Sequence, residues 1–495
     1  MVGKGFHGRE HYRPSGTYRF FPFRFTRFEH RILAVNEVGE HLFLSQEDFD
    51  DFVGKRLPTS SAVYADLKGK HFLFDSDALA PFGLLATKYR TKKSSLADFT
   101  ALHIFVVTLR CEHSCGYCQV SRVSADRERF DMSRETADRA LDLVFRSPSP
   151  RVKIEFQGGE PLLNFERIRE IVETAEARIR SVEKEVDFVV TTNLAMVTDE
   201  MLHFFRDYRV CVSTSLDGPE AIHNANRPRP GSDSYARTIE GLSHAREVLG
   251  HDSVAALMTA TRRSLEEPEA IVDEYVRQGF SSIFLRPLSP YGFAKKAANR
   301  IGYSVDEYLM FYVRALHRIL EINRAGRSLV ETYAQILLTR MLTPFGTGYV
   351  DLQSPAGAGI AVAVYNYDGD VYASDESRML AEMGDRRFRL GNVLEDRYED
   401  IFGGRALREI VAESVIESWP GCADCAFLPW CGADPVLNYA TGGDLVGHRP
   451  TSDFHRKHDF LFRHLLNLYE SDADVRKIFS AWVMNVPMTE LEASA

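Results

Sequence analysis

Three cysteines on one short segment are the residues of this chain best suited to chemistry. Cys111, Cys115 and Cys118 have the spacing Cys-x3-Cys-x2-Cys and directly follow an apolar run over residues 104–107. Three thiolates on one loop can hold three irons of a four-iron cluster and leave the fourth iron open to chemistry. A structural zinc site is the alternative, but it needs four ligands, and His113 is the only other candidate in the loop. The spacing therefore favours an iron–sulfur cluster.

The use of cysteine along the chain also indicates its setting. Of seven cysteines, six fall in two tight groups, the second being Cys422, Cys425 and Cys431, and Cys211 stands alone in an apolar run. This pattern is typical of metal sites and not of a disulfide framework, so we expect a reducing compartment. Residues 1–16 lack the apolar core of a signal peptide, and no run approaches the roughly 18 apolar residues of a membrane span. We expect a cytoplasmic protein with no membrane partner.

Length and composition limit the possible architectures and partners. With 495 residues and 44% hydrophobic content, the chain can bury one large core and one or two smaller ones, so two or three domains are expected. The formal net charge is −10, and no basic stripe stands out. Because contacts to phosphates need clustered lysine and arginine, a nucleic acid is not an expected partner.

Short apolar runs alternate with amphipathic stretches between residues 102 and 326, and this alternation predicts how the cysteines are positioned. The predicted strands are Leu102–Leu109, Val152–Phe156, Val186–Thr191, Val210–Ser215, Val254–Thr259 and Ser282–Arg286. The predicted helices are Ser133–Phe145, Phe165–Val182, Thr198–Tyr208, Tyr235–Leu249, Pro268–Gln278 and Val305–Ala325. Six strand-then-helix units predict an α/β fold with a parallel sheet, either doubly wound or curled into an incomplete barrel.

Ligand sites of such sheets lie at the carboxyl ends of the strands, and this is where the unusual residues fall. The second strand is followed by Gly158, Gly159 and Glu160; the glycines let a backbone approach a ligand closely, and the carboxylate can accept from a ligand amine. Hydroxyls and a carboxylate at the fourth strand suit ribose, and a later arginine can grip a carboxylate. The remaining strand-end candidates are Asn193, Ser215, Asp217, Arg227 and Arg286.

Together these motifs resemble the radical S-adenosylmethionine (SAM) enzymes over residues 100–330. The resemblance is carried by the three cysteines with Tyr117 before the last of them, Gly158-Gly159-Glu160-Pro161, Thr192-Asn193, and Ser215-Leu216-Asp217-Gly218-Pro219, in the order of that family. It implies a partial (β/α)6 TIM-like barrel. It also implies a [4Fe–4S] cluster on Cys111, Cys115 and Cys118 that chelates SAM through the open iron.

The resemblance also implies a reaction and assigns roles. One electron from the cluster cleaves SAM, and the resulting 5′-deoxyadenosyl radical takes a hydrogen atom from the substrate. Gly158, Gly159 and Glu160 would meet the amino group of the cofactor. The other implied cofactor residues are Tyr117, Asn193, Ser215 and Asp217, with Arg227 or Arg262 on its carboxylate.

The chain after the barrel resembles the SPASM/Twitch-like extension of peptide-modifying and sulfatase-maturing members. Ser354 and Ser374 stand where that extension has cysteines, so we expect the first auxiliary cluster to be absent. Cys422, Cys425 and Cys431 remain, and the candidates for a fourth ligand are His455, with His448 and His458 as rivals. Three thiolates and one imidazole also suit zinc, so an iron–sulfur cluster and zinc both stay open. By the same resemblance Asp375 is a candidate general base, whereas an exposed turn acid is the plain alternative.

The first hundred residues fit neither region. Aromatic residues recur over 18–25, and Ser45-x-x-Asp48 precedes an amphipathic stretch, which predicts a capped helix. Short strands followed by small helices resemble the domains that recognise a leader peptide by pairing it with a sheet edge, whereas a plain extension of the barrel is the alternative. The expected divisions are an N-terminal α+β domain over 1–98, the barrel over 99–330, the auxiliary metal domain over 331–465 and a helical tail over 466–495.

Nearly the whole chain is similar to one subfamily, the His-Xaa-Ser system radical SAM maturases. The similarity rests on residues 21–40, Ser374-Asp375-Glu376-Ser377-Arg378-Met379-Leu380, and the stretch from Cys431 to Arg449. It implies a ribosomally made partner peptide with His-Xaa-Ser repeats, a second radical SAM maturase, and a reductant such as a flavodoxin or ferredoxin. The product could be a cross-link, an epimer or an oxidised side chain. Two other functions remain open: a sulfatase-type formylglycine-forming maturase, and a non-catalytic zinc-binding scaffold.

Overall fold

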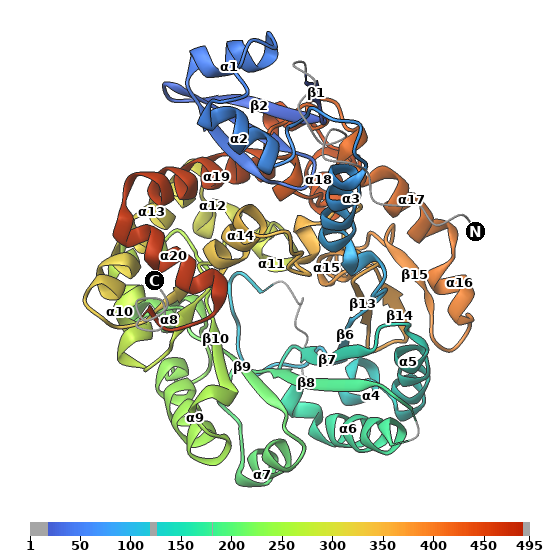
Figure 1. The fold of residues 1–495 in the computed structure, drawn as a ribbon. Helices are drawn as coiled ribbons and strands as arrows, with labels where there is room; N and C mark the ends of the chain where they lie inside the picture. Colours follow the sequence, from blue (N-terminus) through green and yellow to red (C-terminus); the bar gives the residue numbers. More distant parts are fainter. Residues whose placement is uncertain (1–17, 119–125, 181, 489–495) are drawn as a thin grey trace.

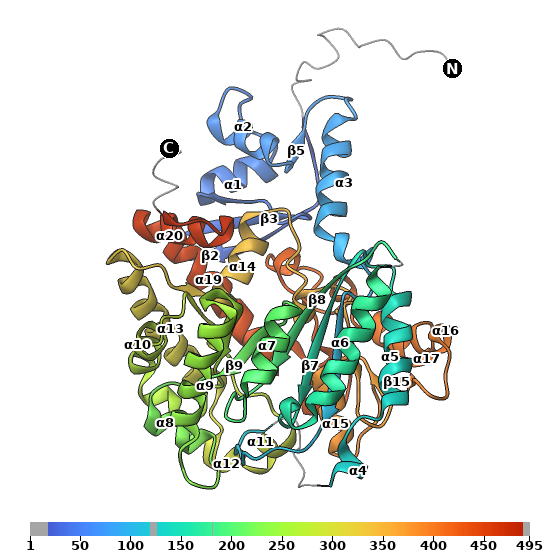
Figure 2. The same cartoon turned by 90° about the horizontal axis from the view of Figure 1, so that it is seen from below.

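The computed structural model describes residues 18–118, 126–180 and 182–488 (Figure 1). Expectations drawn from residues 1–16, and from the last part of the predicted tail after residue 488, lie outside the described residues. A curved sheet of largely parallel strands, covered by helices on its outer side, forms the body of the molecule. A small N-terminal domain sits at one end of this body (Figures 1 and 2).

Six strand-then-helix units follow one another as the sequence predicts. The strands are β6 (Leu102–Thr108), β7 (Arg151–Gly158), β8 (Glu185–Thr191), β9 (Cys211–Ser215), β10 (Val254–Leu257) and β11 (Ser282–Ile283). Their helices are α5 (Arg134–Arg146), α6 (Phe165–Ile179), α7 (Asp199–Asp207), α9 (Ser234–Leu249), α10 (Pro268–Arg277) and α13 (Val305–Arg324). The hydroxyls of Ser133, Thr198 and Ser304 accept backbone hydrogen bonds at the starts of α5, α7 and α13, and so fix where these helices begin. Short helices in the connections are α4 (Arg127–Phe130), α8 (Glu220–Asn226), α11 (Gly292–Lys296) and α12 (Ala298–Ile301).

The main sheet continues past the end of the predicted barrel. Its strand order is β10-β9-β8-β7-β6-β13-β14-β15, with β6 to β10 parallel. Strand β13 (Val362–Tyr365) pairs in parallel with β6, Val362 opposite Leu102 and Tyr365 opposite Phe105. All four residues of β13 are buried, so β6 has no exposed edge on this side. The C-terminal region therefore extends the barrel sheet itself.

The sixth unit closes the barrel only in part. Strand β11 pairs in parallel with β12 (Val330–Glu331) in a separate sheet of two strands. Near β10, the backbone N–H of Ala260 donates to the carbonyl of Arg286 at 2.9 Å. The segments that follow β10 and β11 thus stay in contact although β11 is not part of the main sheet. Among the described residues, β6 and β11 do not pair to close a full barrel, which agrees with the partial (β/α)6 barrel predicted from the sequence.

The C-terminal region packs against the open side of the barrel. Strands β14 (Asp370–Tyr372) and β15 (Arg389–Asn392) continue the sheet in antiparallel pairing. Its helices are α14 (Thr332–Leu342), α15 (Asp375–Glu382), α16 (Tyr398–Phe402), α17 (Arg405–Glu413), α18 (Pro435–Gly442), α19 (Asp453–Ser471) and α20 (Ala473–Met484). Buried side chains of α19 and α20, such as Leu461 and Ile478, share one hydrophobic core with the barrel strands.

The N-terminal domain has a separate hydrophobic core. A three-stranded antiparallel sheet has the order β2-β3-β4, and β1 pairs with β5. These strands are β1 (Arg19–Phe20), β2 (Phe23–Phe28), β3 (Arg31–Asn36), β4 (His41–Leu44) and β5 (Leu73–Phe74), and the helices are α1 (Gln46–Val53), α2 (Ala62–Gly69) and α3 (Ala80–Lys92). Ser45 caps α1 by accepting from the N–H of Asp48, and Phe49 and Phe52 are buried, as the sequence predicts.

This domain contacts the C-terminal region close to the second cysteine group. The indole N–H of Trp430, next to Cys431, donates to the carbonyl of Gly39 at 3.1 Å. Lys93 pairs with Glu417 at 2.8 Å. In the part of the chain that the structure describes, no helix is both long and apolar enough to cross a membrane.

Candidate functional site

The cysteine loop and the ends of β7, β8, β9 and β10 surround one cavity. The loop follows β6, and the cavity has a volume of about 160 Å³. It is lined by Cys111, His113, Cys115, Tyr117, Cys118, Gln157, Gly158, Gly159, Glu160, Thr191, Thr192, Asn193, Ser215, Arg227 and Thr259. The structure thus gathers most of the candidate cofactor residues in one place, and it adds Thr259.

Two glycines at the end of β7, Gly158 being its last residue, are needed for the backbone of the cysteine loop. A Cβ on Gly158 would lie 2.4 Å from the carbonyl oxygen of Thr108, and one on Gly159 would lie 2.2 Å from that of Arg110. Instead the N–H of Gly159 donates to Thr108 at 2.8 Å, and the N–H of Glu160 donates to Arg110 at 2.7 Å. The glycines therefore hold the start of the loop against β7 as well as lining the cavity.

Glu160 is fixed by a cage of donors. Its side chain is 1% exposed, and Oε1 accepts from the hydroxyl of Thr192 at 2.6 Å and the N–H of Leu162 at 3.0 Å. Oε2 accepts from the N–H of Asn193 at 2.9 Å, which leaves it able to accept from a ligand. Burial, and then the nearby charge of Glu112, raise the pKa of Glu160 to about 8. A cationic ligand group in the cavity would favour its charged form.

The thiols of the loop need a bound metal centre to lose their protons and become ligands. Burial raises the pKa of Cys115 to about 12 and that of Cys111 well above its usual value. At neutral pH both are therefore neutral unless a metal centre draws off the proton. This environment does not favour a free, reactive thiolate.

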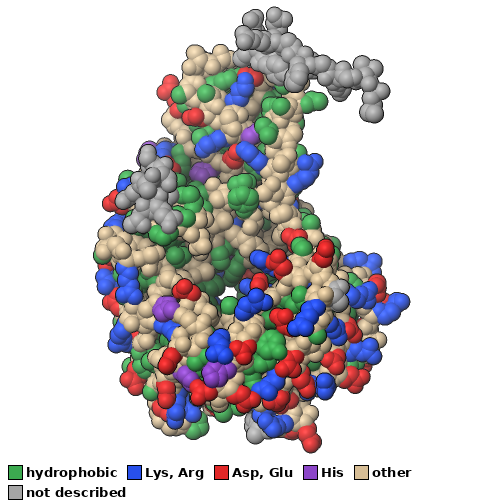
Figure 3. All heavy atoms as spheres, turned by 60° about the horizontal axis from the view of Figure 1, so that its bottom comes forward, with side chains coloured by type: hydrophobic (Ala, Val, Ile, Leu, Met, Phe, Trp, Pro, Cys, Tyr) green, Lys and Arg blue, Asp and Glu red, His purple; other side chains and the backbone are tan. Residues whose placement is uncertain are grey.

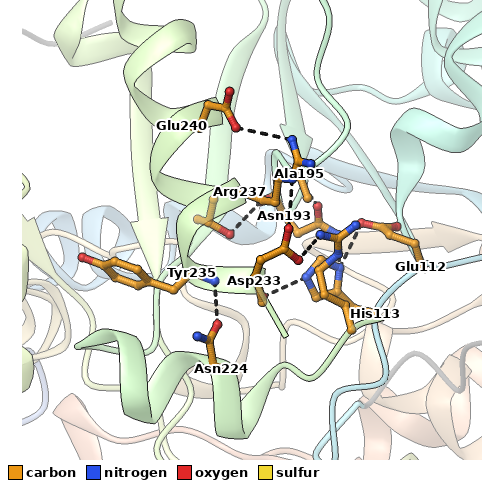
Figure 4. Close-up of polar contacts among 12 residues, drawn as sticks. Glu112, His113, Asn193, Ala195, Asn224, Asp233, Tyr235, Arg237 and Glu240 are labelled. Atoms are coloured by element: carbon orange, nitrogen blue, oxygen red, sulfur yellow. Dashed lines mark hydrogen bonds and ion pairs between the residues drawn. The ribbon is translucent and has the colours of Figure 1, made fainter. Parts of the chain in front are cut away.

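His113 is not free to complete a set of four ligands. Its Nδ1 lies 2.9 Å from Oε1 of Glu112 and its Nε2 lies 2.8 Å from Oγ of Ser234. The side-chain N–H of Asn193 donates to the same Oε1 at 2.7 Å, and Figure 4 shows Glu112, His113 and Asn193 pointing toward one another. On the other side, Oγ of Ser234 lies 3.1 Å from Nε2 of His223.

This buried chain of polar side chains ties the cysteine loop to β8 and α9. Glu112, Ser234 and His223 were not singled out by the sequence analysis. Nothing in the sequence places Ser234 beside His113, because 121 positions separate them.

Asp217 supports the cavity wall and does not face the cavity. Its side chain has no exposed surface and accepts from the hydroxyl of Tyr117 at 2.6 Å, from Nε and Nη2 of Arg227 at 3.1 and 3.2 Å, and from the N–H of Thr259 at 3.2 Å. Burial alone would raise the pKa of Asp217, but the charge of Arg227 holds it below its ordinary value. Arg227 lines the cavity 5.3 Å from the ring centre of Tyr117. Arg262, the other candidate for the cofactor carboxylate, pairs with Glu307 at 3.3 Å on the surface.

Comparison with known proteins assigns a family to the part of the chain that forms most of this cavity. The sequence of residues 105–275 matches the model of the radical SAM superfamily. Residues 105–275 form a radical SAM domain.

Several characterised relatives share this domain. The radical SAM cyclopropyl synthase TigE of Paramaledivibacter caminithermalis is 27% identical over 155 residues, 29% of this chain and 32% of TigE. The serine-type anaerobic sulfatase-maturating enzyme of Bacteroides thetaiotaomicron is 29% identical over 143 residues, 28% of this chain and 33% of that enzyme. This chain thus spans about a third of the length of these two relatives. The cysteine-type anaerobic sulfatase-maturating enzyme of Clostridium perfringens is 22% identical over 332 residues, 65% of this chain and 84% of the relative.

Solved structures share the fold beyond the radical SAM domain. The structure of anSMEcpe with bound AdoMet has a TM-score of 0.61 at 16% identity and covers 74% of this chain and 97% of that one. SuiB of Streptococcus suis, bound to its precursor peptide SuiA, has a TM-score of 0.52 at 13% identity and covers 88% of this chain and 98% of that one. At these identities the likeness establishes the fold, a radical SAM α/β fold with a mostly parallel central sheet.

The superfamily implies a [4Fe–4S] cluster and SAM, and the residues of the radical SAM domain fit both. Three thiols reach the cavity, and both ring nitrogens of His113, the nearest imidazole, are engaged by other side chains. In the described part of the chain, one set of three or more candidate ligand atoms lies within 4.8 Å of one another, that of Cys111, Glu112 and His113. The three sulfurs are thus spread more widely than around one tetrahedral ion. A cluster held by three cysteines matches this donor set.

The second cysteine group lies outside the radical SAM domain, between α17 and α18. Cys422, Cys425 and Cys431 are half-buried, and burial raises the pKa of Cys431 to about 12. Within the described residues, these three sulfurs do not all lie within 4.8 Å of one another, as the ligands of one tetrahedral ion would.

The three candidate histidines differ in their availability as a fourth ligand. Both nitrogens of His458 are engaged, Nε2 with the hydroxyl of Tyr333 at 2.5 Å and Nδ1 with the carbonyl of Phe454 at 2.7 Å. His448 contacts Thr451 through Nδ1 at 3.0 Å. Nδ1 of His455 lies 3.4 Å from Nε of Arg449, which also bonds the carbonyl of Gly421 beside Cys422. The contacts of His458 thus leave it no free nitrogen, whereas His448 and His455, each engaged through Nδ1, both stay candidates for the second group.

Ser354 and Ser374, the two serines expected to stand at the positions of auxiliary-cluster cysteines, have structural roles. The hydroxyl of Ser354 donates to Glu417 and accepts from the N–H of Ile416, whereas Ser374 caps α15. Asp375, the candidate base, accepts from Nε and Nη2 of Arg378, both at 3.1 Å, and Arg378 is completely buried. This ion pair engages Asp375 with the protein itself.

Proposed function

We propose that this chain is a radical SAM maturase that modifies a ribosomally made peptide. When bound, the cluster and SAM supply one-electron cleavage to a 5′-deoxyadenosyl radical, which abstracts a hydrogen atom from the substrate. The observation that carries the proposal is a loop of three cysteines whose nearest imidazole, that of His113, is engaged at both nitrogens, in one cavity with Glu160, Asn193 and Arg227. This arrangement leaves one corner of a cluster for the cofactor.

The residues around the cavity have distinct tasks in this proposal. Glu160, caged by Thr192 and Asn193, accepts from the amino group of SAM. Arg227, held by Asp217, offers its guanidinium to the cofactor carboxylate. Asn193 and Ser215 line the cavity for the ribose or carboxylate, and Tyr117 provides an apolar wall.

The peptide substrate is supported by the N-terminal domain and by the relatives. Strand β4 pairs with β3 alone among the described residues, which leaves an edge for an added strand. Helix α3 contacts the turn before β4, where Lys88 pairs with Glu40 at 2.5 Å. It has Lys92 as its single buried residue and exposes apolar side chains, Leu84 by 58% and Tyr89 by 39%. Such exposure is typical of a docking surface. We infer that this surface receives the leader segment of a peptide with His-Xaa-Ser repeats, and that a flavodoxin or ferredoxin and a second maturase act with this chain.

Charge placed on α3 should weaken peptide binding without affecting the cofactor site. We expect Leu84→Asp to raise the Kd for a synthetic peptide carrying a leader and His-Xaa-Ser repeats about tenfold, or about 1.4 kcal/mol. Fluorescence anisotropy of the labelled peptide measures the change. Met310→Asp is the matched control, because Met310 is also on a helix and 71% exposed but lies on α13. Equal binding by the two variants would contradict a docking role for α3.

The second cysteine group is proposed to hold an auxiliary iron–sulfur cluster. Tetrahedral zinc with bonds of about 2.3 Å would bring its thiolates within about 4 Å of one another. Sulfurs on separate irons of a cluster lie farther apart, and the choice is supported because the sulfurs of Cys422, Cys425 and Cys431 do not all lie within 4.8 Å of one another.

Reconstitution under anaerobic conditions tests the proposal. Iron, acid-labile sulfide and zinc are measured together, and 5′-deoxyadenosine is measured after addition of SAM and dithionite. We expect iron and sulfide for two clusters and SAM-dependent formation of 5′-deoxyadenosine. If the protein contained zinc without sulfide and did not cleave SAM, the result would contradict the radical SAM enzyme and support a zinc-binding scaffold. One cluster plus zinc would retain the enzyme and overturn the auxiliary cluster.

A further inference from the structure

A second group of charged side chains lies where the barrel meets the C-terminal region. Its members come from five separate segments, and each is half-buried. We call it the mouth group: Asp351 in the short helix Val350–Leu352, Glu376 in the first turn of α15, Asp434 at the start of α18, Arg286 after β11 and Lys457 in α19.

The three carboxyl groups of the mouth group act on one another. Burial and then the charge of Asp434 raise the pKa of Asp351 to about 7. Burial and then Asp351 raise the pKa of Glu376 to about 7, and burial, with Glu376 the main neighbouring charge, does the same for Asp434. Three acids drawn from distant segments are therefore close together and partly deprived of water.

Among the residues that the structure describes, the carboxylates of Asp351 and Glu376 lack the side-chain hydrogen bonds that buried polar groups usually have, whereas Oδ1 of Asp434 accepts from the N–H of Leu437 at 2.9 Å. Within the described residues, no hydrogen bond reaches the carboxylate of Asp351, and Glu376 has Arg286 at 4.0 Å, beyond hydrogen-bond distance. The hydroxyl of Tyr291, a residue 1% exposed, has no partner, although the charges of Asp434, Glu376 and Asp351 all act on it. An unpaired hydroxyl close to the carboxylates of Asp351 and Glu376 indicates a ligand that is bound during function.

The mouth group adjoins the cofactor cavity. Thr259 lines that cavity, and the next residue, Ala260, donates its N–H to the carbonyl of Arg286 at 2.9 Å. On its far side Lys457 lines a separate cavity of about 460 Å³ between the segment 287–308 and the C-terminal region. Figure 3 shows the molecule hollowed in the middle of the face it presents. The mouth group thus lies between a large cavity and the cofactor.

We propose that Asp351, Glu376 and Asp434 bind a cationic nitrogen group of the substrate, an imidazolium or an ammonium, and hold it beside the cofactor cavity. When all three carboxyl groups are ionised they exceed the two cations of the mouth group by one negative charge, and a bound cation favours that ionised form. The ammonium of Lys457 already lies 5.2 Å from the ring centre of Tyr333. Asp375 takes no part, because Arg378 compensates it. The inference rests on the proposed function in taking the substrate to be a peptide.

Binding of matched peptides to the reconstituted holoprotein tests the inference. The probes are blocked heptapeptides that differ only at the central residue, which is histidine, lysine or glutamine, and isothermal titration calorimetry at pH 6.5 gives their Kd. We expect the histidine or the lysine peptide to bind at least about tenfold more tightly than the glutamine peptide. A preference for histidine identifies an imidazolium ligand, and a preference for lysine identifies an ammonium ligand.

Variants then assign the preference to the mouth group. Glu376→Gln and Asp351→Asn should each reduce it to below about threefold. Asp453→Asn is the control, because Asp453 lines the larger cavity but pairs with Arg456 at 3.8 Å. Equal binding of all three peptides, no binding up to millimolar concentration, or a preference that survives both variants would overturn the inference. Calorimetry measures binding without turnover. A peptide preference in a protein that forms no 5′-deoxyadenosine would therefore contradict the proposed function and leave the cation site intact.

Discussion

Replacement of Cys115 by alanine is expected to abolish 5′-deoxyadenosine formation, with a loss of at least about three orders of magnitude, or about 4 kcal/mol in activation free energy. Cys115 is the middle one of the three proposed cluster ligands, and apart from the other two, no thiol or free imidazole of the described residues lines the cavity. The nearest imidazole, that of His113, is engaged at both nitrogens by Glu112 and Ser234. Anaerobic assay of the variant, with iron and sulfide measured on the same sample, checks the expectation.

The chain offers its own control for this substitution. Cys211, the first residue of β9, is exposed and lies outside both cysteine groups. Cys211→Ala should keep the iron content and the rate of the unaltered protein, which separates loss of a ligand from loss of any thiol. Retention of more than about a tenth of the activity by Cys115→Ala would contradict the assignment of the cluster to this loop.

Much of the barrel could be predicted from the sequence, because its signals are local. Apolar runs of four to eight residues and helix caps such as Ser133 and Ser304 lie within a few positions of the elements that they define. The signals of the site are local as well, because the cysteine loop begins just after β6, and Gly158 and Gly159 lie at the end of β7. The rule that ligands bind at the carboxyl ends of strands then brought these motifs together.

The remaining features depend on contacts between distant positions. Strand β13 is an ordinary apolar run of four residues, and its pairing with β6, about 260 positions earlier, has no local signature. The carboxylates of Asp351 and Glu376 are recognised as free to bind a ligand only in the folded structure, where both act on the buried hydroxyl of Tyr291. Asp217 was assigned to the cofactor because its residue type suits ribose, whereas the fold places it behind Arg227 and Tyr117.

Asp217→Asn is expected to lower the free energy of unfolding by about 3–5 kcal/mol, because it leaves the half-enclosed guanidinium of Arg227 without its counter-charge. The carboxylate is completely buried, and its three side-chain hydrogen bonds to Arg227 and Tyr117 are 2.6 to 3.2 Å long. Urea denaturation of the variant and of the unaltered protein, at equal metal loading, measures the difference. Because Arg227 also loses its fixed orientation, the affinity for SAM should fall about tenfold or more in equilibrium dialysis.

A double substitution separates the two effects. Asp217→Leu together with Arg227→Met removes both charges and should recover most of the lost stability, since apolar residues of similar size often replace a buried ion pair without cost. It should not recover SAM binding, because the guanidinium itself is gone. A stability loss below about 1 kcal/mol in Asp217→Asn would mean that water reaches the pair. Full SAM affinity in the double variant would mean that Arg227 does not bind the cofactor, so that Asp217 and Arg227 serve the barrel wall alone.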